Sequence, residues 1–128
     1  MITIGKPVGR SRTIGHLKGD KGGPTMIFFG GIHGNEPSGE QAIQEVFNGI
    51  VKNGISANGN FYGIRGNVAA LLAGKRFLDR DLNRLWTDEK IEKIKAKSKY
   101  ELLSEDKELL SIHQILSDIL KTESGPFY

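Results

Sequence analysis

The chain has 128 residues, of which 38% are hydrophobic and 26% charged, with 17 glycines and no cysteine. These values fit a single globular domain and exclude a collagen, a disordered tail and a membrane protein. The lack of cysteine excludes a disulfide framework and a thiolate metal site. The N-terminus has no apolar run like that of a signal peptide. We therefore expect a soluble, cytoplasmic protein with no membrane partner.

The charge is divided unevenly along the chain. Residues 1–84 carry 11 Lys/Arg and 6 Asp/Glu, a net charge of +5, whereas residues 85–128 carry 7 and 9, a net charge of −2. The cations of the basic part are scattered and have no aromatic residues between them, so we predict no nucleic-acid partner. Five cations between Arg65 and Arg84 accompany two aspartates. This grouping favours a pocket for a small anion.

The first half of the chain alternates strand and helix patterns. Residues 13–18 have the pattern of a strand, and residues 19–24 that of a turn. The continuous apolar run over residues 25–29 predicts a strand buried on both faces. A helix is predicted from near Pro37 to near Asn53-Gly54. Its apolar side comprises Ala42, Ile43, Val46, Phe47 and Ile50.

The second half is predicted to be mainly helical. A strand over residues 61–64 leads through a short apolar segment, 68–73, to an irregular charged stretch, 75–86. Helices are predicted over residues 88–99 and 106–122, and Phe127-Tyr128 is expected to begin another strand. Alternation of strands and helices indicates an α/β layer structure. The apolar face of the last helix comprises Leu109, Leu110, Ile112, Leu116, Ile119 and Leu120.

His33 and Glu36 are the first candidate site residues. They lie three residues apart, after a predicted buried strand and before a helix, in a segment that contains Gly30, Gly31 and Gly34. An imidazole nitrogen and a carboxylate are a common pair of zinc ligands. By itself such a pair is more often a turn with a helix-capping carboxylate. The position at the carboxyl end of a strand favours a site, because open α/β sheets bind their ligands there.

The second candidate is the stretch from Arg76 to Arg84, which reads Arg-Phe-Leu-Asp-Arg-Asp-Leu-Asn-Arg. An arginine fork grips a carboxylate through two hydrogen bonds, and Asn83 adds a donor. The alternative is a solvated charged loop whose ion pairs contribute little.

These two motifs together, with Asn67 between them, resemble the succinylglutamate desuccinylase/aspartoacylase family, a branch of the zinc carboxypeptidase-like hydrolases. The matching residues are Gly30–Pro37, Asn67, Arg76 and the run Asp81-Leu82-Asn83-Arg84. The resemblance implies an α/β fold with a three-layer, mixed-sheet, zinc-carboxypeptidase-like (phosphorylase/hydrolase-like) architecture. It also implies hydrolysis of the amide bond of an N-acyl amino acid, such as N-succinylglutamate or N-acetylaspartate, by a zinc-activated water.

The resemblance also assigns roles to individual residues. His33 and Glu36 would be two of three protein ligands to one zinc ion. Arg76 would stabilise the oxyanion that develops on the scissile carbonyl. Asn83 and Arg84 would hold the carboxylate of the small anionic substrate. Asn67 would line the same pocket, and Asp81 would orient the arginines.

The chain departs from the family pattern at its end. The family's third zinc ligand is a histidine on a strand after the helix predicted at 106–122, and its catalytic glutamate comes later still. His113 has the setting of a packing residue, and His16 is expected to be exposed on the first strand. Neither Glu40 nor Glu45 has a pattern that makes it the base. We therefore expect residues 1–128 to be the N-terminal part of one catalytic domain, with weak or no zinc binding and no activity by themselves.

Two other functions remain open. A non-catalytic module would bind a small anion on the backbone N–H groups of the glycine-rich loop at residues 30–34. A metallocarboxypeptidase acting on peptides would use the same metal pair and carboxylate grip. Whatever the function, an incomplete sheet that ends in apolar residues is expected to expose an edge and to favour self-association.

Overall fold

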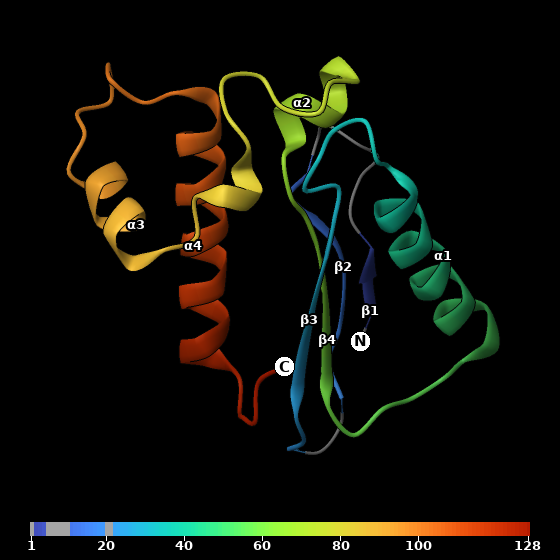
Figure 1. Ribbon diagram of the computed structural model, residues 1–128. Coiled ribbons are helices and arrows are strands. Elements are labelled where there is room, and N and C mark those ends of the chain that lie inside the picture. Colours follow the sequence, from blue (N-terminus) through green and yellow to red (C-terminus); the bar gives the residue numbers. More distant parts are fainter. Residues whose placement is uncertain (1, 5–10, 20–21) are drawn as a thin grey trace.

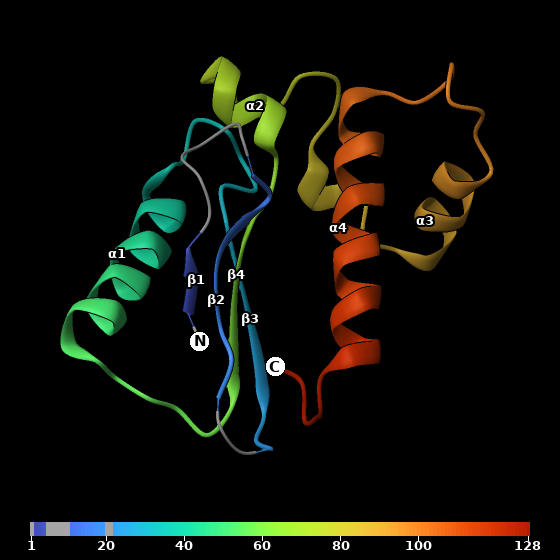
Figure 2. The ribbon, with the colours of Figure 1, turned by 180° about the vertical axis from the view of Figure 1, so that it is seen from behind.

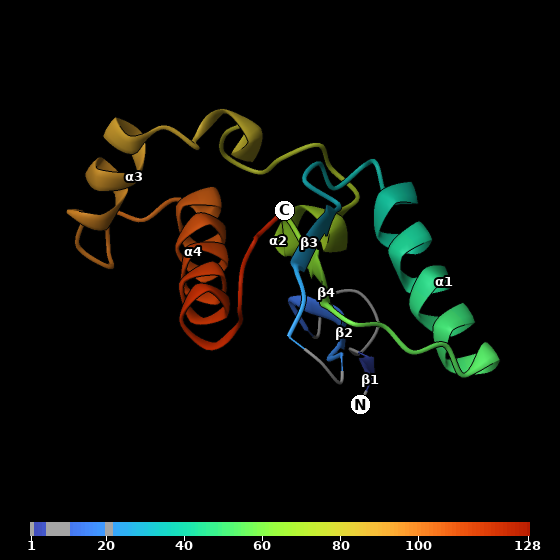
Figure 3. The ribbon, with the colours of Figure 1, turned by 90° about the horizontal axis from the view of Figure 1, so that it is seen from below.

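The computed structural model describes residues 2–4, 11–19 and 22–128. The turn predicted over residues 19–24 includes residues 20 and 21, which lie outside the described residues. The described chain forms three layers, in which helix α1 (Ser38–Asn53) covers one face of a sheet and helix α4 (Ser104–Thr122) lies beside the other (Figures 1 and 3). This arrangement confirms the three-layer α/β expectation.

The sheet is mixed, as expected. Its strands are β1 (Ile2–Ile4), β2 (Thr13–Leu17), β3 (Thr25–Gly30) and β4 (Asn60–Arg65), in the spatial order β1-β2-β4-β3. Strand β2 pairs antiparallel with β1 and β4, whereas β3 and β4 are parallel. The parallel pair ends with Gly30 opposite Arg65. The segments that follow β3 and β4 therefore start from the same edge of the sheet, which Figure 2 shows beneath α2.

Helix α1 confirms the predicted helix and its end. Gly54 follows it in the left-handed conformation, with φ of 58°, and its N–H group binds the last helical carbonyls. Phe47 is buried against Ile14 and Leu17 of β2, so this side of the helix forms one core cluster. Val46, predicted to be on the apolar side, is 59% exposed. The face of α1 that packs on the sheet is therefore narrower than the predicted apolar side.

The prediction that strand β3 is buried on both faces is wrong. Phe28 and Phe29 are 43% and 38% exposed. Strand β3 is at one end of the spatial order β1-β2-β4-β3. An apolar cavity of about 340 Å³ separates Phe29 from Ile112 of α4. Among the described residues, the first half of β3 has a further neighbour on this side, because Ile27 N–H donates to Tyr128 O at 2.8 Å. The parallel bridge between Thr25 and Phe127 confirms that the last residues begin a strand.

The second half contains α2 (Val68–Ala73), a 3₁₀ turn η1 (Leu82–Arg84), α3 (Asp88–Lys95) and α4. Helix α3 ends four residues before the predicted Lys99, because the chain turns at Ser98, whose N–H donates to the Glu101 carboxylate at 2.9 Å. Helix α4 begins two residues before the predicted start. None of the helices in the described ranges is long and apolar enough to cross a bilayer.

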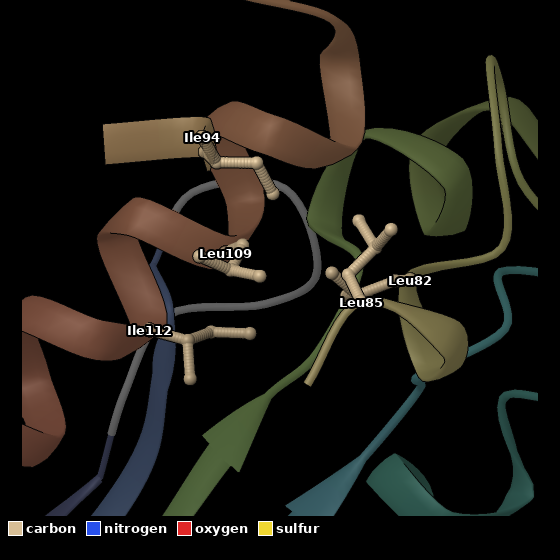
Figure 4. Close-up of a cluster of buried hydrophobic side chains, with 5 residues drawn as sticks. All are labelled: Leu82, Leu85, Ile94, Leu109 and Ile112. Carbon is tan, nitrogen blue, oxygen red and sulfur yellow. The ribbon is translucent and has the colours of Figure 1, made fainter. Parts of the chain in front are cut away.

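A second core cluster joins the irregular stretch to α4. Leu82 and Leu85 face Leu109 and Ile112, with Ile94 of α3 beside them (Figure 4). All five side chains are buried, whereas Leu120, predicted to be on the same face of α4, is 56% exposed. The end of the charged loop is thereby fixed to α4 by apolar packing.

Candidate metal and anion site

Two loops meet at the edge of the sheet where β3 and β4 end. The first follows β3 and carries His33 and Glu36, and the second joins α2 to α3. Gly31 turns the first loop with a positive φ of 73°, which favours glycine. Gly34 packs so closely on α2 that an added Cβ would overlap the backbone of Ala70. Its N–H group donates to the carbonyl oxygen of Arg76 at 3.2 Å, so the two loops are directly joined.

His33 lies between two carboxylates. Its Nε2 is 2.9 Å from Asp81 Oδ1, and its Nδ1 is 3.4 Å from Glu36 Oε2. The imidazole side chain is 11% exposed and that of Asp81 19% exposed. With Nε2–H donating to Asp81, the lone pair of Nδ1 points to the same side as Glu36. This is the arrangement in which a carboxylate behind a histidine orients it as a metal ligand.

Asp81 is held in its charged form. Burial acts to raise its pKa, but hydrogen bonds from His33 and from the Asn83 N–H, with the nearby positive charge of Arg76, lower the pKa overall. Asp81 Oδ1 accepts the Asn83 N–H at 3.0 Å. We expected Asp81 to orient the arginines. The structure places it nearer to His33 than to Arg76, whose Nη2 is 3.9 Å from Oδ2.

The spacing of His33 and Glu36 fits a zinc ion. Two ligands at about 2.0–2.2 Å from zinc in tetrahedral geometry are roughly 3.4 Å apart, and Nδ1 and Oε2 are 3.4 Å apart. Within residues 2–4, 11–19 and 22–128, no group of three His, Asp or Glu side chains is placed to hold a metal ion. The two donors therefore fit as part of a zinc site.

The other two histidines lie elsewhere. His16 stacks on Tyr62, with ring centroids 3.9 Å apart, and is half-buried rather than exposed as predicted. Burial lowers its pKa, although the charge of Glu123 opposes that shift. His113 lies on α4 beside the buried Ile112. Glu40 is buried in an ion pair with Arg65.

Of the three arginines in the second loop, only Arg76 contacts the histidine–glutamate pair. Its Nη1 donates to Glu36 Oε1 at 3.0 Å, while the other oxygen of Glu36 faces His33. Arg76 is 49% exposed, so it lies between solvent and the pair. Arg80 instead pairs with the buried Asp106. The expected cation beside the candidate ligands is therefore present.

Asn83 and Arg84 lie on η1, directly after Asp81, and are exposed. In the described part of the chain neither side chain makes a hydrogen bond or salt bridge. Their position and exposure make both side chains accessible to a ligand at this edge of the molecule.

Asn67 has a different place from the one that we expected. It is fully buried, its Nδ2 donates to Glu105 Oε1 at 3.0 Å, and its Oδ1 accepts the Ala70 N–H at 3.1 Å. Both ends of the amide are thus used inside the protein. Asn67 begins α2 and supports the second loop rather than lining an open pocket.

Glu105 was not predicted as a site residue, yet its carboxylate accepts three backbone N–H groups of the second loop. An acidic residue in the first turn of a helix is ordinarily expected to be solvated and to favour the helix dipole. A signal was present, however, because Glu105, Glu108, Leu109 and Ile112 recur at helical spacing. That spacing places the carboxylates on the apolar, buried face of α4.

Fold and site together define an α/β protein with a histidine–glutamate pair and an arginine-bearing loop at the carboxyl edge of a mixed sheet. Residues 22–122 match the family described as the succinylglutamate desuccinylase/aspartoacylase catalytic domain. The chain belongs to this family.

Individual relatives match parts of the chain. A succinylglutamate desuccinylase of Pseudomonas putida KT2440 is 31% identical over 67 residues, which are 52% of this chain and 20% of that protein. One from Ectopseudomonas mendocina is 31% identical over 64 residues, covering 50% and 19% of the two proteins. The matched region thus spans about a fifth of these relatives.

Solved structures show the same fold. The succinylglutamate desuccinylase of Vibrio cholerae superposes with a TM-score of 0.69 at 19% identity, covering 90% of this chain and 32% of that one. That of Chromobacterium violaceum gives 0.66 at 19% identity, covering 84% and 33%. The chain therefore has the architecture of about one third of these proteins.

Proposed function

We propose that this chain provides part of the active site of a zinc-dependent hydrolase that cleaves the amide bond of an N-acyl amino acid. The substrate would be of the N-succinylglutamate or N-acetylaspartate type. The observation that carries the proposal is the arrangement of His33: its Nε2 is fixed by Asp81, and its Nδ1 lies 3.4 Å from Glu36 at the spacing of two zinc ligands.

His33 and Glu36 would hold the metal. Bound zinc supplies a Lewis acid and lowers the pKa of water, which provides a nucleophile at neutral pH. Asp81 holds the His33 ring and its tautomer, so that Nδ1 remains available as a ligand. The remaining oxygen of Glu36 accepts from Arg76, which fixes the orientation of the ligand carboxylate.

The exposed cations would bind the substrate. Arg76 is half exposed beside Glu36, where its guanidinium would stabilise negative charge developing on a carbonyl oxygen. Asn83 and Arg84 are on the adjoining turn and would hold a substrate carboxylate, for which a guanidinium is suited through its two parallel donors. An N-acyl amino acid with two or three carboxylates complements this concentration of positive charge.

The isolated 128-residue chain is expected to bind zinc weakly and not to catalyse hydrolysis. Two protein ligands fit the metal, whereas catalytic zinc sites use three and leave the fourth position to water. Turnover would also require a general base, and Glu40 is unsuited to this role because its carboxylate is paired with Arg65 in the interior.

The test is a zinc titration of the chain with His33→Ala and, as a matched control, His113→Ala on α4. The wild-type and control proteins are expected to bind zinc in competition with a weak chromophoric chelator, and His33→Ala is expected to lose that binding. Equal zinc binding by all three proteins would contradict the metal site.

A second measurement separates the possible functions. N-succinylglutamate, N-acetylaspartate and a peptide with a free C-terminus would be assayed for binding and hydrolysis, with and without zinc. Binding of the two N-acyl amino acids that is lost in Arg84→Ala supports the proposal. Binding that is independent of zinc and His33 would instead indicate an anion-binding module, and preference for the peptide would indicate a carboxypeptidase.

A further inference from the structure

The loop between α2 and α3 has little apolar support where it approaches the site. Phe77 and Leu78 are 37% and 40% exposed, and regular structure resumes only at η1. Leu82 is the first residue after α2 that is buried in the core. Yet Arg76 and Asp81, on either side of residues 78–80, both contact the histidine–glutamate pair. Some other contact must fix the backbone between them.

That contact is the carboxylate of Glu105, which is fully buried. Its Oε1 accepts the Leu78 N–H at 2.7 Å, and its Oε2 accepts the N–H groups of Asp79 and Arg80 at 3.0 and 3.2 Å. Three successive N–H groups thus surround one carboxylate, as they surround bound anions in other proteins. Burial acts to raise the pKa of Glu105, but these bonds and that from Asn67 lower it overall, so the group stays charged.

Glu105 is in the first turn of α4, but it does not cap its own helix. The neighbouring Asp106 does so, because its Oδ2 accepts the Leu103 N–H at 3.0 Å. All four hydrogen bonds of Glu105 go to residue 67 or to residues 78–80, outside α4. Its buried charge therefore acts on the loop.

We propose that Glu105 is a positioning residue of the active site, which fixes the backbone at residues 78–80 and thereby places Arg76 and Asp81 against His33 and Glu36. That Glu105 matters for catalysis rests on the proposed function. The positioning itself does not require a metal. The contacts that produce it extend from Glu105 through the loop to Asp81, whose Oδ1 accepts the Nε2–H of His33.

The test compares Glu105→Gln with Glu108→Gln. The control residue is also buried on α4 and accepts two backbone N–H groups, from Val68 and Ala69, but none from residues 78–80. In Glu105→Gln an amide NH₂ replaces one carboxylate oxygen. A donor then faces the backbone N–H donors of the loop, so hydrogen bonds to the loop are lost. Both variants lose a buried carboxylate, so an effect confined to the loop distinguishes positioning from general destabilisation.

Two readouts need no metal. Amide hydrogen exchange at residues 78–80, measured by NMR under native conditions, is expected to accelerate at least about tenfold in Glu105→Gln relative to Glu108→Gln. Nitrogen-15 spectra of the His33 ring are expected to show the Nε2–H tautomer in the wild type and in Glu108→Gln. In Glu105→Gln a mixture of tautomers is expected, because Asp81 is no longer held.

A third readout is the affinity for zinc alone, expected to fall about tenfold in Glu105→Gln and less than twofold in the control. Equal amide exchange in the two variants, or an unchanged His33 tautomer in Glu105→Gln, would overturn the inference. Failure of the wild type to bind zinc would contradict the proposed function. Amide exchange and the His33 tautomer would still decide whether Glu105 positions the loop. If Glu105→Gln does not fold, Glu105→Asp, which withdraws the carboxylate by one methylene, is subject to the same criteria.

Discussion

Replacing Asp81 with asparagine tests the part of the site on which the proposed function depends most. Asp81 Oδ1 accepts both the Nε2–H of His33 and the N–H of Asn83. An asparagine oxygen can accept the same two bonds, so the variant removes the negative charge while preserving the shape of the loop. The change therefore isolates what the charge behind His33 contributes.

The expected loss in zinc affinity follows from two estimates. A hydrogen bond to a charged group contributes about 1.5–3 kcal/mol and a neutral one about 0.5–1.5 kcal/mol, so the charge contributes about 1–1.5 kcal/mol. Replacing the partner behind a metal-binding histidine reduces affinity about 10–100-fold, or about 1.4–2.7 kcal/mol. The two ranges meet near tenfold, which is the expected loss for Asp81→Asn.

The assay is competition for zinc with a chromophoric chelator, with Asp79→Asn as the control. Asp79 is on the same loop, but its carboxylate accepts the Ser104 N–H at 2.7 Å and does not contact His33. The control is expected to bind zinc within twofold of the wild type. If Asp81→Asn also binds within twofold, while His33→Ala does not bind, the carboxylate has no part in orienting the ligand and the reasoning fails.

Three further predictions concern stability. Leu109→Ala is expected to lower the free energy of unfolding, measured with denaturant, by about 2–5 kcal/mol because the side chain is fully buried. Leu120→Ala, at 56% exposure, is expected to change it little. Equal losses would contradict the assigned core. Gly34→Ala is expected to lower the melting temperature because its Cβ overlaps the backbone of Ala70, whereas Gly49→Ala, with open space in mid-helix, is expected to stabilise by about 0.5–1 kcal/mol. Since the pKa of Glu105 is lower in the folded than in the unfolded chain, its carboxylate stabilises the protein above the unfolded pKa of about 4.3, and this stabilisation is lost as the pH falls through the folded value. The free energy of unfolding of Glu105→Gln is therefore expected to be below that of the wild type at pH 7, and the difference is expected to shrink as the pH falls below the unfolded pKa; a constant difference would contradict the shift.

Strands β2, β3 and β4 and the main helices were predictable from local pattern, whereas β1 was not predicted. The run at residues 25–29 and the Asn53-Gly54 signal predicted β3 and the end of α1, because strand composition and helix termination are encoded by neighbouring residues. The exposure of Phe28 and Phe29 was not predictable in this way. It depends on the position of β3 at the end of the strand order and on its distance from α4, which are properties of the assembled sheet.

The candidate site divides in the same manner. His33, Glu36 and Arg76 were identified from motifs, and the structure brings them together. The places of Asn67 and Glu105 were not identified, because their side chains meet across 38 residues of sequence. Residue type alone does not tell whether an asparagine lines a pocket or supports a loop; that depends on which buried partner its amide meets.

The dependence of the second loop on α4 has a consequence for the order in which the protein is made. His33, Glu36 and Arg76 leave the ribosome well before Glu105, and Arg12, which binds Glu108, precedes its partner by 96 residues. A nascent chain that has reached residue 100 contains every candidate zinc and substrate residue of this chain but lacks the carboxylate that orders the loop between them. The loop between α2 and α3 is therefore ordered only once the start of α4 has been made, although every candidate zinc and substrate residue of this chain precedes α4.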